Sequence, residues 1–199
     1  QFRDTDLTGT AIWLNGIANL SLHDNTFTDV YTGMLESTIL IAAHWNRTVN
    51  QNIDIYKNTF QGISVDGIKL AYYGVYDNGW GETEPTDDTF KDVSIHCNNL
   101  AGINPGYGIS NTYDTVTMNA PDNWWGAADG PSGAGTGGGV PVSAYVDYDP
   151  WLSGPWEETS PCASLPEPVG GTTTHMRPRG LLGALAALVL AGLVGSAVT

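Results

Sequence analysis

The stretch Asn52-Ile-Asp-Ile-Tyr-Lys-Asn-Thr-Phe60 decides the fold, because three other parts of the chain repeat its pattern. Ile53 and Ile55 stand two positions apart, which is the period of a β-strand with one buried face. An asparagine follows three positions after the second isoleucine, and a large apolar residue comes two positions later. The related segments are Asn19–Phe27, Asp92–Leu100 and residues 115–125. Such a repeat is typical of solenoids, whose units stack on one another.

Stacking the segments places like residues in columns. The asparagines are Asn25, Asn58 and Asn98, and in the fourth segment two extra residues delay the asparagine to Asn123. The large apolar column is Phe27, Phe60, Leu100 and Trp125. Asparagine tolerates the left-handed conformation of turns and hydrogen-bonds along its own stack. We therefore expect this column to be part of the architecture and not a reaction centre.

A second strand, opened by glycine, is expected after each segment. The glycine strands are Gly9–Leu14, Gly33–Glu36, Gly67–Leu70 and Gly108–Asn111. The spacing between them varies, which predicts insertions at one corner, at residues 37–51, 71–91 and 112–114. Strands stacked in this way predict an all-β parallel β-helix. An antiparallel β-sandwich is the alternative; it explains the alternation but not the shared register of the columns.

The end of the repeat region carries a recognisable closing segment. It reads Asn123-Trp-Trp-Gly126, then Asp129-Gly-Pro-Ser-Gly133, then Val146-Asp-Tyr-Asp-Pro-Trp-Leu152. Together with the repeats, this resembles the closing segment of many bacterial and archaeal right-handed β-helix surface proteins, a group that includes pectate-lyase-like folds. The resemblance implies a right-handed parallel β-helix on an exported protein. The bulky residues would form a cap over its open end: Trp124, Trp125, Tyr148, Trp151 and Leu152.

The chain is expected to have three parts: a β-helix with its cap at residues 1–152, a disordered linker rich in Pro, Gly and Thr at 153–179, and one hydrophobic helix at 180–199. The last part is uncharged and long enough to span a bilayer. Arg177 and Arg179 precede it, an arrangement that would put the β-helix in the cytoplasm. A cleaved anchor signal or a sorting tail are the alternatives that reconcile this with export. Because Gln1 falls within a repeat, we expect a C-terminal fragment, with any export signal or active site upstream.

The composition excludes some functions. The net charge of −14 would repel a phosphate backbone, so nucleic-acid binding is not expected. The two cysteines, Cys97 and Cys162, make no disulfide framework and no zinc-ligand spacing. We expect separate thiols, with a disulfide as the alternative.

Binding residues are predicted in the insertions, because loops at one corner of a solenoid line one side of it. Aromatic faces beside carboxylates suit a carbohydrate, with or without Ca²⁺, which takes oxygen ligands; no other cofactor is expected. Solvated loops without a ligand are the simpler alternative. The candidates are His44, Trp45, Tyr72, Tyr73, Tyr76, Trp80, Asp87 and Asp88.

The outward face of the repeated strand is a second candidate. One column there is expected to hold Ser21, Asp54, Ser94 and Thr117, and the next His23, Tyr56, His96 and Asn119. A flat polar and aromatic stripe of this kind could cradle an extended polysaccharide, although plain exposure is the simpler interpretation. Since Tyr56 separates the two histidines, a metal shared between them is not expected.

The function expected from the sequence is a non-catalytic module displayed on the cell surface and anchored to the membrane, which binds polysaccharide or other surface components. The motifs of pectin hydrolases are absent, and no pair of carboxylates has a recognisable catalytic spacing. A polysaccharide lyase or glycosidase with part of its site upstream, and a structural stalk or adhesin, are the alternatives. Two triplets match the N-glycosylation pattern, at Asn19 and Asn46.

Overall fold

The structure is a computed structural model of the 199-residue chain, and it describes residues 2–3, 6–7, 10–32, 37–44, 49–73 and 89–164. The chain divides into two compact units, Gln1–Leu165 and Pro166–Thr199. All described residues belong to the first unit. The hydrophobic helix predicted at 180–199 therefore lies outside the described residues. Within them, no helix has the length and apolar character needed to cross a bilayer.

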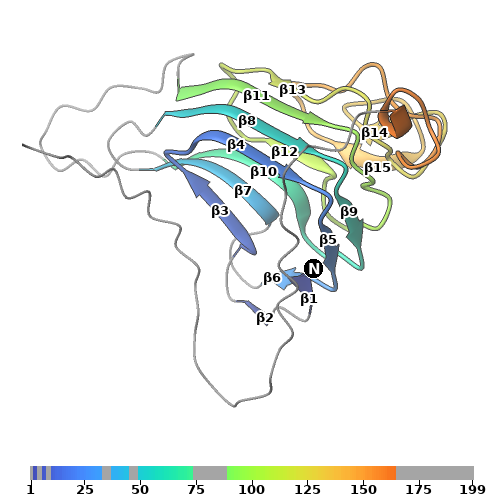
Figure 1. The fold of residues 1–199 in the computed structure, drawn as a ribbon, viewed down its shortest axis with the longest axis horizontal. Helices are drawn as coiled ribbons and strands as arrows, with labels where there is room; N and C mark the ends of the chain where they lie inside the picture. The colour runs from blue at the N-terminus through green and yellow to red at the C-terminus, as the bar shows by residue number, and fades with distance from the viewer. Residues whose placement is uncertain are drawn as a thin grey trace, which may run out of the picture. The chain divides into compact units, whose positions relative to one another are not determined.

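The first unit is all-β, and every strand pairing in its described part is parallel (Figure 1). A six-stranded sheet has the order β14-β15-β12-β10-β7-β3, a five-stranded sheet the order β16-β13-β11-β8-β4, and two smaller sheets the orders β1-β5-β9 and β2-β6. The strands are β1 (Phe2–Arg3), β2 (Asp6–Leu7), β3 (Ile12–Asn15), β4 (Ala18–His23), β5 (Thr26–Thr28), β6 (Tyr31–Thr32), β7 (Ser37–His44), β8 (Asn50–Tyr56), β9 (Thr59–Gln61), β10 (Asp66–Tyr73), β11 (Phe90–His96), β12 (Ile109–Asn111), β13 (Met118–Asn119), β14 (Pro131–Gly133), β15 (Gly139–Val142) and β16 (Val146–Asp147); a 3₁₀ helix, η2, covers Cys162–Ser164.

The chain visits the sheets in a fixed order. It passes from β4 through β5 to β7, then from β8 through β9 to β10, and each new strand pairs with its counterpart from the previous round. Figure 1 shows the strands of the five-stranded sheet lying side by side, with the six-stranded sheet as a second layer. This arrangement is compatible with a solenoid of the β-helix kind. It excludes the antiparallel sandwich, whose strands run in alternate directions.

The asparagine column is confirmed as an internal hydrogen-bond ladder. The side-chain Oδ1 of Asn58 accepts from the backbone N–H of Asn25 at 3.1 Å, and Oδ1 of Asn98 accepts from the backbone N–H of Asn58 at 3.0 Å. Oδ1 of Asn123 does the same for Asn98 at 2.9 Å. The residue before each asparagine has a left-handed backbone, with φ between 52° and 56°. These residues are Asp24, Lys57, Cys97 and Asp122. The ladder therefore satisfies buried polar groups at a tight turn.

The large apolar column is confirmed as the centre of the core. Phe27 and Phe60 stack with ring centroids 5.0 Å apart, and parallel bridges at the preceding residues put Leu100 and Trp125 in line with them. All four side chains are buried. The inward residues of both larger sheets pack on this column, so one continuous hydrophobic core runs through the unit.

The fourth repeat has a different register from the expected one. Asn119 and not Thr117 is the partner of Ser94, so Met118 takes the place of Val93 and Ala120 that of Ile95. Asn123 then follows without any extra residues. The sequence misled here because Val116 and Met118 show the expected alternation, whereas the small Ala120, fully buried, is the true second inward residue.

The first predicted insertion is largely a strand. Residues 37–44, which the glycine pattern placed in a corner loop, form β7, and Ile39 pairs with Ile68 of β10. Ala71–Tyr73, placed in the second insertion, complete β10. Alternation failed as a signal because both faces of β7 are covered: Leu40 and Ala42 are buried on the face opposite to the core residues Ile39 and Ile41. The predicted glycine strand Gly33–Glu36 lies outside the described residues.

The closing segment continues beyond the boundary expected at residue 152. Residues 153–164, here called the C-terminal strap, belong to the compact unit that ends at Leu165. The expectation of separate thiols is wrong, because Cys97 and Cys162 form a disulfide. Leu152 is buried with this disulfide, and the Lys57 ammonium lies 5.4 Å from the centre of the Trp156 ring. These contacts give the strap a small core of its own.

The expected cap residues occupy different environments. Trp125 is fully buried in the main core, and Tyr148 and Trp151 pack against that core while partly exposed. Trp124 instead packs beside the disulfide. Trp151 lies directly against the backbone at Gly130, whose φ of 89° no other residue adopts easily.

Replacing Gly130 with alanine is expected to lower the free energy of unfolding by about 1–3 kcal/mol. The new Cβ would lie 2.6 Å from a ring atom of Trp151, and the backbone would be strained as well. Gly138→Ala is the matched control, because its Cβ would meet only the Asp129 carboxylate, at 3.6 and 3.7 Å, and its backbone is not left-handed. Urea denaturation of both variants measures the difference; equal stabilities would contradict the packing described.

Candidate ligand-binding face

The outer face of the five-stranded sheet carries the polar columns that the sequence placed there. Ser21 pairs with Asp54, Asp54 with Ser94, and Ser94 with Asn119. His23 pairs with Tyr56, and Tyr56 with His96. We call these seven residues the outer stripe. Alternation along the strands turns them away from the core, while Leu20, Ile53 and Val93 face inward.

The three rings of the outer stripe form a continuous stack. The centroids of His23 and Tyr56 are 4.8 Å apart with the planes 16° from parallel, and those of Tyr56 and His96 are 5.4 Å apart at 7°. Tyr56 therefore has a neighbour on both ring faces. Tyr56 also packs against the cluster of Cys97, Leu152 and Cys162, and the stack holds all three side chains in fixed directions.

Carboxylates hold the two imidazoles in place. Nδ1 of His23 lies 2.6 Å from Oδ2 of Asp24, and Nε2 of His96 lies 2.9 Å from Oδ1 of Asp54. The second bond crosses from β11 to β8, so it ties neighbouring strands together. The imidazoles are 23% and 24% exposed, so both reach solvent at the surface. The stripe thus combines imidazole, phenol and carboxylate groups in a rigid array.

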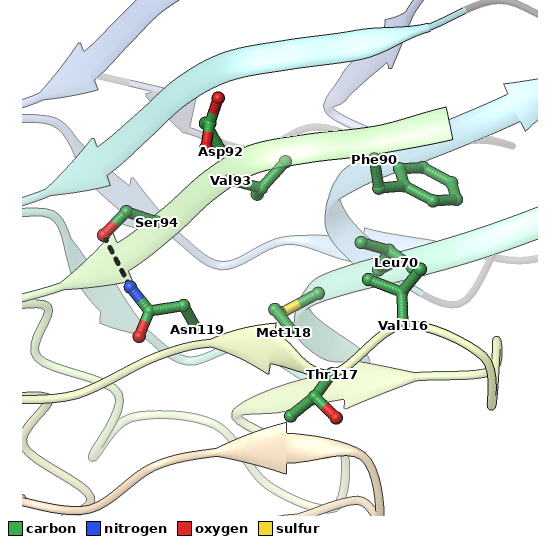
Figure 2. Close-up of a pocket in the computed structure, with 9 residues that line it drawn as sticks. All are labelled: Leu70, Phe90, Asp92, Val93, Ser94, Val116, Thr117, Met118 and Asn119. Carbon is green, nitrogen blue, oxygen red and sulfur yellow. Dashed lines mark hydrogen bonds between the residues drawn. The ribbon is translucent and has the colours of Figure 1, made fainter. Parts of the chain in front are cut away.

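A pocket opens beside the stripe, between β11 and the segment that leads into β13 (Figure 2). The two strands pair only at Ser94 and Asn119, because the chain before Met118 turns away from β11. The cavity has a volume of about 450 Å³, which is within the range of small-molecule sites. Its apolar wall consists of Leu70, Phe90, Val93, Val116 and Met118, and its polar lining of Asp92, Ser94, Thr117 and Asn119.

A left-handed backbone conformation brings Asp92 to the surface. Asn19, Asn52 and Asp92 occupy one register position, and all three have a left-handed backbone with φ between 51° and 58°. At this point two consecutive residues, such as Lys91 and Asp92, are both exposed, which breaks the alternation. Asparagine and aspartate suit the position because their short polar side chains tolerate this conformation.

The candidate glycosylation residue Asn19 lies on this same face. It is exposed, and its Oδ1 accepts a hydrogen bond from Nδ2 of Asn52 at 3.0 Å. Asn46, the other candidate, lies outside the described residues. A glycan on Asn19 would therefore occupy the sheet face at its β4 edge; modification at either residue stays a prediction.

The loop residues predicted from sequence are only partly described. His44 and Tyr73 are register partners at the ends of β7 and β10. The Tyr72 side chain is half-buried and packs toward the core, with its ring 5.9 Å from that of Tyr113. It is therefore not presented on a loop. The other candidates lie outside the described residues: Trp45, Tyr76, Trp80, Asp87 and Asp88. A site in these loops stays a prediction.

The pocket was missed at the sequence level. The pocket is bordered by the segment between β12 and β13, where the sequence predicted only a short insertion at residues 112–114. The outer stripe was predicted from the sequence with one difference. Asn119, which was expected in the second column, takes the place of Thr117 in the first column. Among the described residues, no group of three or more His, Cys, Asp or Glu side chains is placed to hold a metal ion.

Comparison with known proteins adds no assignment: no family model, no curated protein and no solved structure matches this chain.

Proposed function

We propose that this chain folds as a right-handed parallel β-helix on an exported surface protein, and that its five-stranded sheet binds an extended polysaccharide without cleaving it. The observation that carries the proposal is the unbroken outer stripe, in which hydrogen-bonding groups follow one another across β4, β8, β11 and β13. The parallel strands and the closing segment Asn123–Leu152 support the fold.

The spacing of the stripe suits a polymer. Neighbouring strands of a sheet lie about 4.8 Å apart, so similar polar groups recur at that interval across the face. A chain of sugars offers hydroxyl groups that also recur at a regular interval. Several weak contacts can then form at once, which raises the overall affinity without any single strong site.

Rigidity favours binding here. The stack of His23, Tyr56 and His96 and the bond from His96 to Asp54 already fix the side chains in the unbound protein. Little conformational entropy is then lost when a ligand binds. Because the ring faces cover one another, the stripe would act through the hydrogen-bonding atoms of its imidazole, phenol and amide groups and through carboxylates that accept from sugar hydroxyl groups.

Binding without cleavage is proposed because the carboxylates of this face have the wrong surroundings for a glycosidase. The proton-donating acid of such an enzyme works from an apolar, water-poor pocket. Asp24 and Asp54 are 38% and 46% exposed, and each is bonded to an imidazole. Both therefore suit ligand binding better than proton transfer.

We also propose that the chain is attached to the membrane. Residues 180–199 are uncharged and long enough to span a bilayer. Intact-mass measurement of the mature protein would show whether this tail is retained or removed. A mature protein that is released into the medium with its tail intact would contradict attachment.

A glycan array with the full chain and its variants tests the binding face. Asp54→Ala removes the central carboxylate of the stripe and releases His96, so bound glycan signal is expected to fall at least about tenfold, which corresponds to about 1.4 kcal/mol. Gln61→Ala is the control, since this exposed residue lies in β9 of another sheet. Unchanged binding by Asp54→Ala would contradict the stripe as the site. If Trp45→Ala and Trp80→Ala lose binding instead, the site lies in the loops.

A further inference from the structure

We infer that the pocket between β11 and β13 selects the acetamido group of a neutral amino sugar. This inference rests on the proposed binding of polysaccharide to the sheet face and narrows it to one class of glycan. It follows from three properties of the pocket: the apolar wall, the polar groups beside it, and the charge around it.

The apolar wall calls for an apolar group on the ligand. Leu70, Phe90 and Met118 are core residues whose side chains also border the cavity, and Figure 2 shows them gathered with Val116. A sugar hydroxyl placed against this wall would lose its hydrogen bonds to water and gain none. A methyl group would instead be removed from water at no such cost. A glycan of unsubstituted hexoses has no methyl group to offer.

The polar lining matches an amide. An acetamido group has one N–H donor and one carbonyl acceptor next to its methyl group. The Asp92 carboxylate can accept from the N–H, and Asn119 and Thr117 can donate to the carbonyl. Asn119 donates to the Ser94 hydroxyl at 3.4 Å, which links the two strands at the end of the pocket and leaves the second amide hydrogen for a ligand. Within the described part of the chain, Asp92 has no ion pair or hydrogen bond of its own.

The charge of the face argues against acidic sugars. Among the residues that the structure describes, Asp92 is the one charged residue that borders the pocket, and Asp54 and Asp147 stand in the neighbouring register column. Lys91 is the one lysine or arginine in the five strands of this sheet. Because the described lining of the pocket includes no Lys, Arg or His, a uronate carboxylate there would face the like charge of Asp92. Neutral glycans escape this repulsion.

Calorimetric titration of the full chain with three tetrasaccharides tests the inference. The probes are a β-1,4-linked N-acetylglucosamine tetramer, the β-1,4-linked glucose tetramer that lacks only the acetamido groups, and a galacturonate tetramer. The N-acetylated probe is expected to bind at least tenfold more tightly than the glucose tetramer, and the galacturonate tetramer is expected to bind more weakly than either.

Two variants locate the effect in the pocket. Val116→Ser makes the apolar wall polar and is expected to reduce the preference for the N-acetylated probe at least fivefold. Asp92→Asn keeps a residue suited to the left-handed backbone and is expected to improve galacturonate binding at least threefold. Gln61→Ala, in β9 of another sheet, is the control and should keep the parent's preference. Thermal melting of each variant checks that it is folded.

The outcomes separate this inference from the proposed function. Equal affinity for the N-acetylated and glucose tetramers, or strongest binding of galacturonate, would overturn the acetamido assignment while glycan binding stands. If Val116→Ser keeps the preference for the N-acetylated probe and Asp92→Asn does not improve galacturonate binding, the pocket is not the source of the selectivity. If none of the three probes binds, the proposed function and the inference both fail.

Discussion

Replacing Asn98 with alanine is expected to lower the free energy of unfolding by about 3–5 kcal/mol, which is at the upper end for a single substitution. The Oδ1 atom of Asn98 accepts from the backbone and the side chain of Asn58, both at 3.0 Å. Its Nδ2 atom donates to the backbone carbonyl of Ile55 at 2.9 Å and to Oδ1 of Asn123 at 3.0 Å. Each buried partner left without a bond costs about 1–3 kcal/mol.

Asn99→Ala is the matched control for this prediction. Asn99 is the next residue, and its side chain makes one exposed hydrogen bond, accepting from the backbone N–H of Ala101 at 3.2 Å. Its loss should cost less than about 1 kcal/mol, because water can replace that bond. Urea denaturation monitored by circular dichroism measures both variants. A loss for Asn98→Ala no larger than that for Asn99→Ala would mean that the ladder is not a main source of stability.

Removing the disulfide with Cys97→Ala and Cys162→Ala together is expected to lower the free energy of unfolding by about 2–4 kcal/mol. The two cysteines are 65 residues apart in sequence. The cross-link therefore closes a long loop in the unfolded chain, where the entropic gain from such a link is about 4 kcal/mol. Loss of the strap from the cluster around Leu152 and Trp156 would add to the effect.

The parent protein supplies the control for the disulfide prediction. Dithiothreitol should lower the melting temperature of the parent toward that of the double variant and leave the double variant unchanged. Alkylation without prior reduction should label neither cysteine in the parent. A melting temperature that does not respond to reduction, or free thiols in the folded parent, would contradict the cross-link.

The repeated strand was predictable because its signals are local. Ile53 and Ile55 alternate with polar residues, and Asn58 and Phe60 follow at a constant distance, so simple comparison of segments places them in columns. The same alternation identified the outward residues Ser21, Asp54 and Ser94. Most of the outer stripe could therefore be found before its geometry was known.

Other elements were missed because their environment removes the signal. In β7 both faces are covered, so Leu40 and Ala42 are as buried as Ile39 and Ile41, and no alternation is left to read. The register of the fourth repeat was predicted wrongly because its second inward residue, Ala120, is small. The left-handed backbone at Asp92 also breaks the period of two on which the prediction depends.

The sequence by itself determined the all-β class, the asparagine ladder and the large apolar column, because identical chemistry at a short, constant spacing has the same structural consequence in every repeat. Only the tertiary structure decided the Cys97–Cys162 disulfide, the stack of His23, Tyr56 and His96, and the pocket beside Asn119. These features join residues from different repeats. They depend on how strands of unequal spacing come into register, and that is settled by the packing of the whole core.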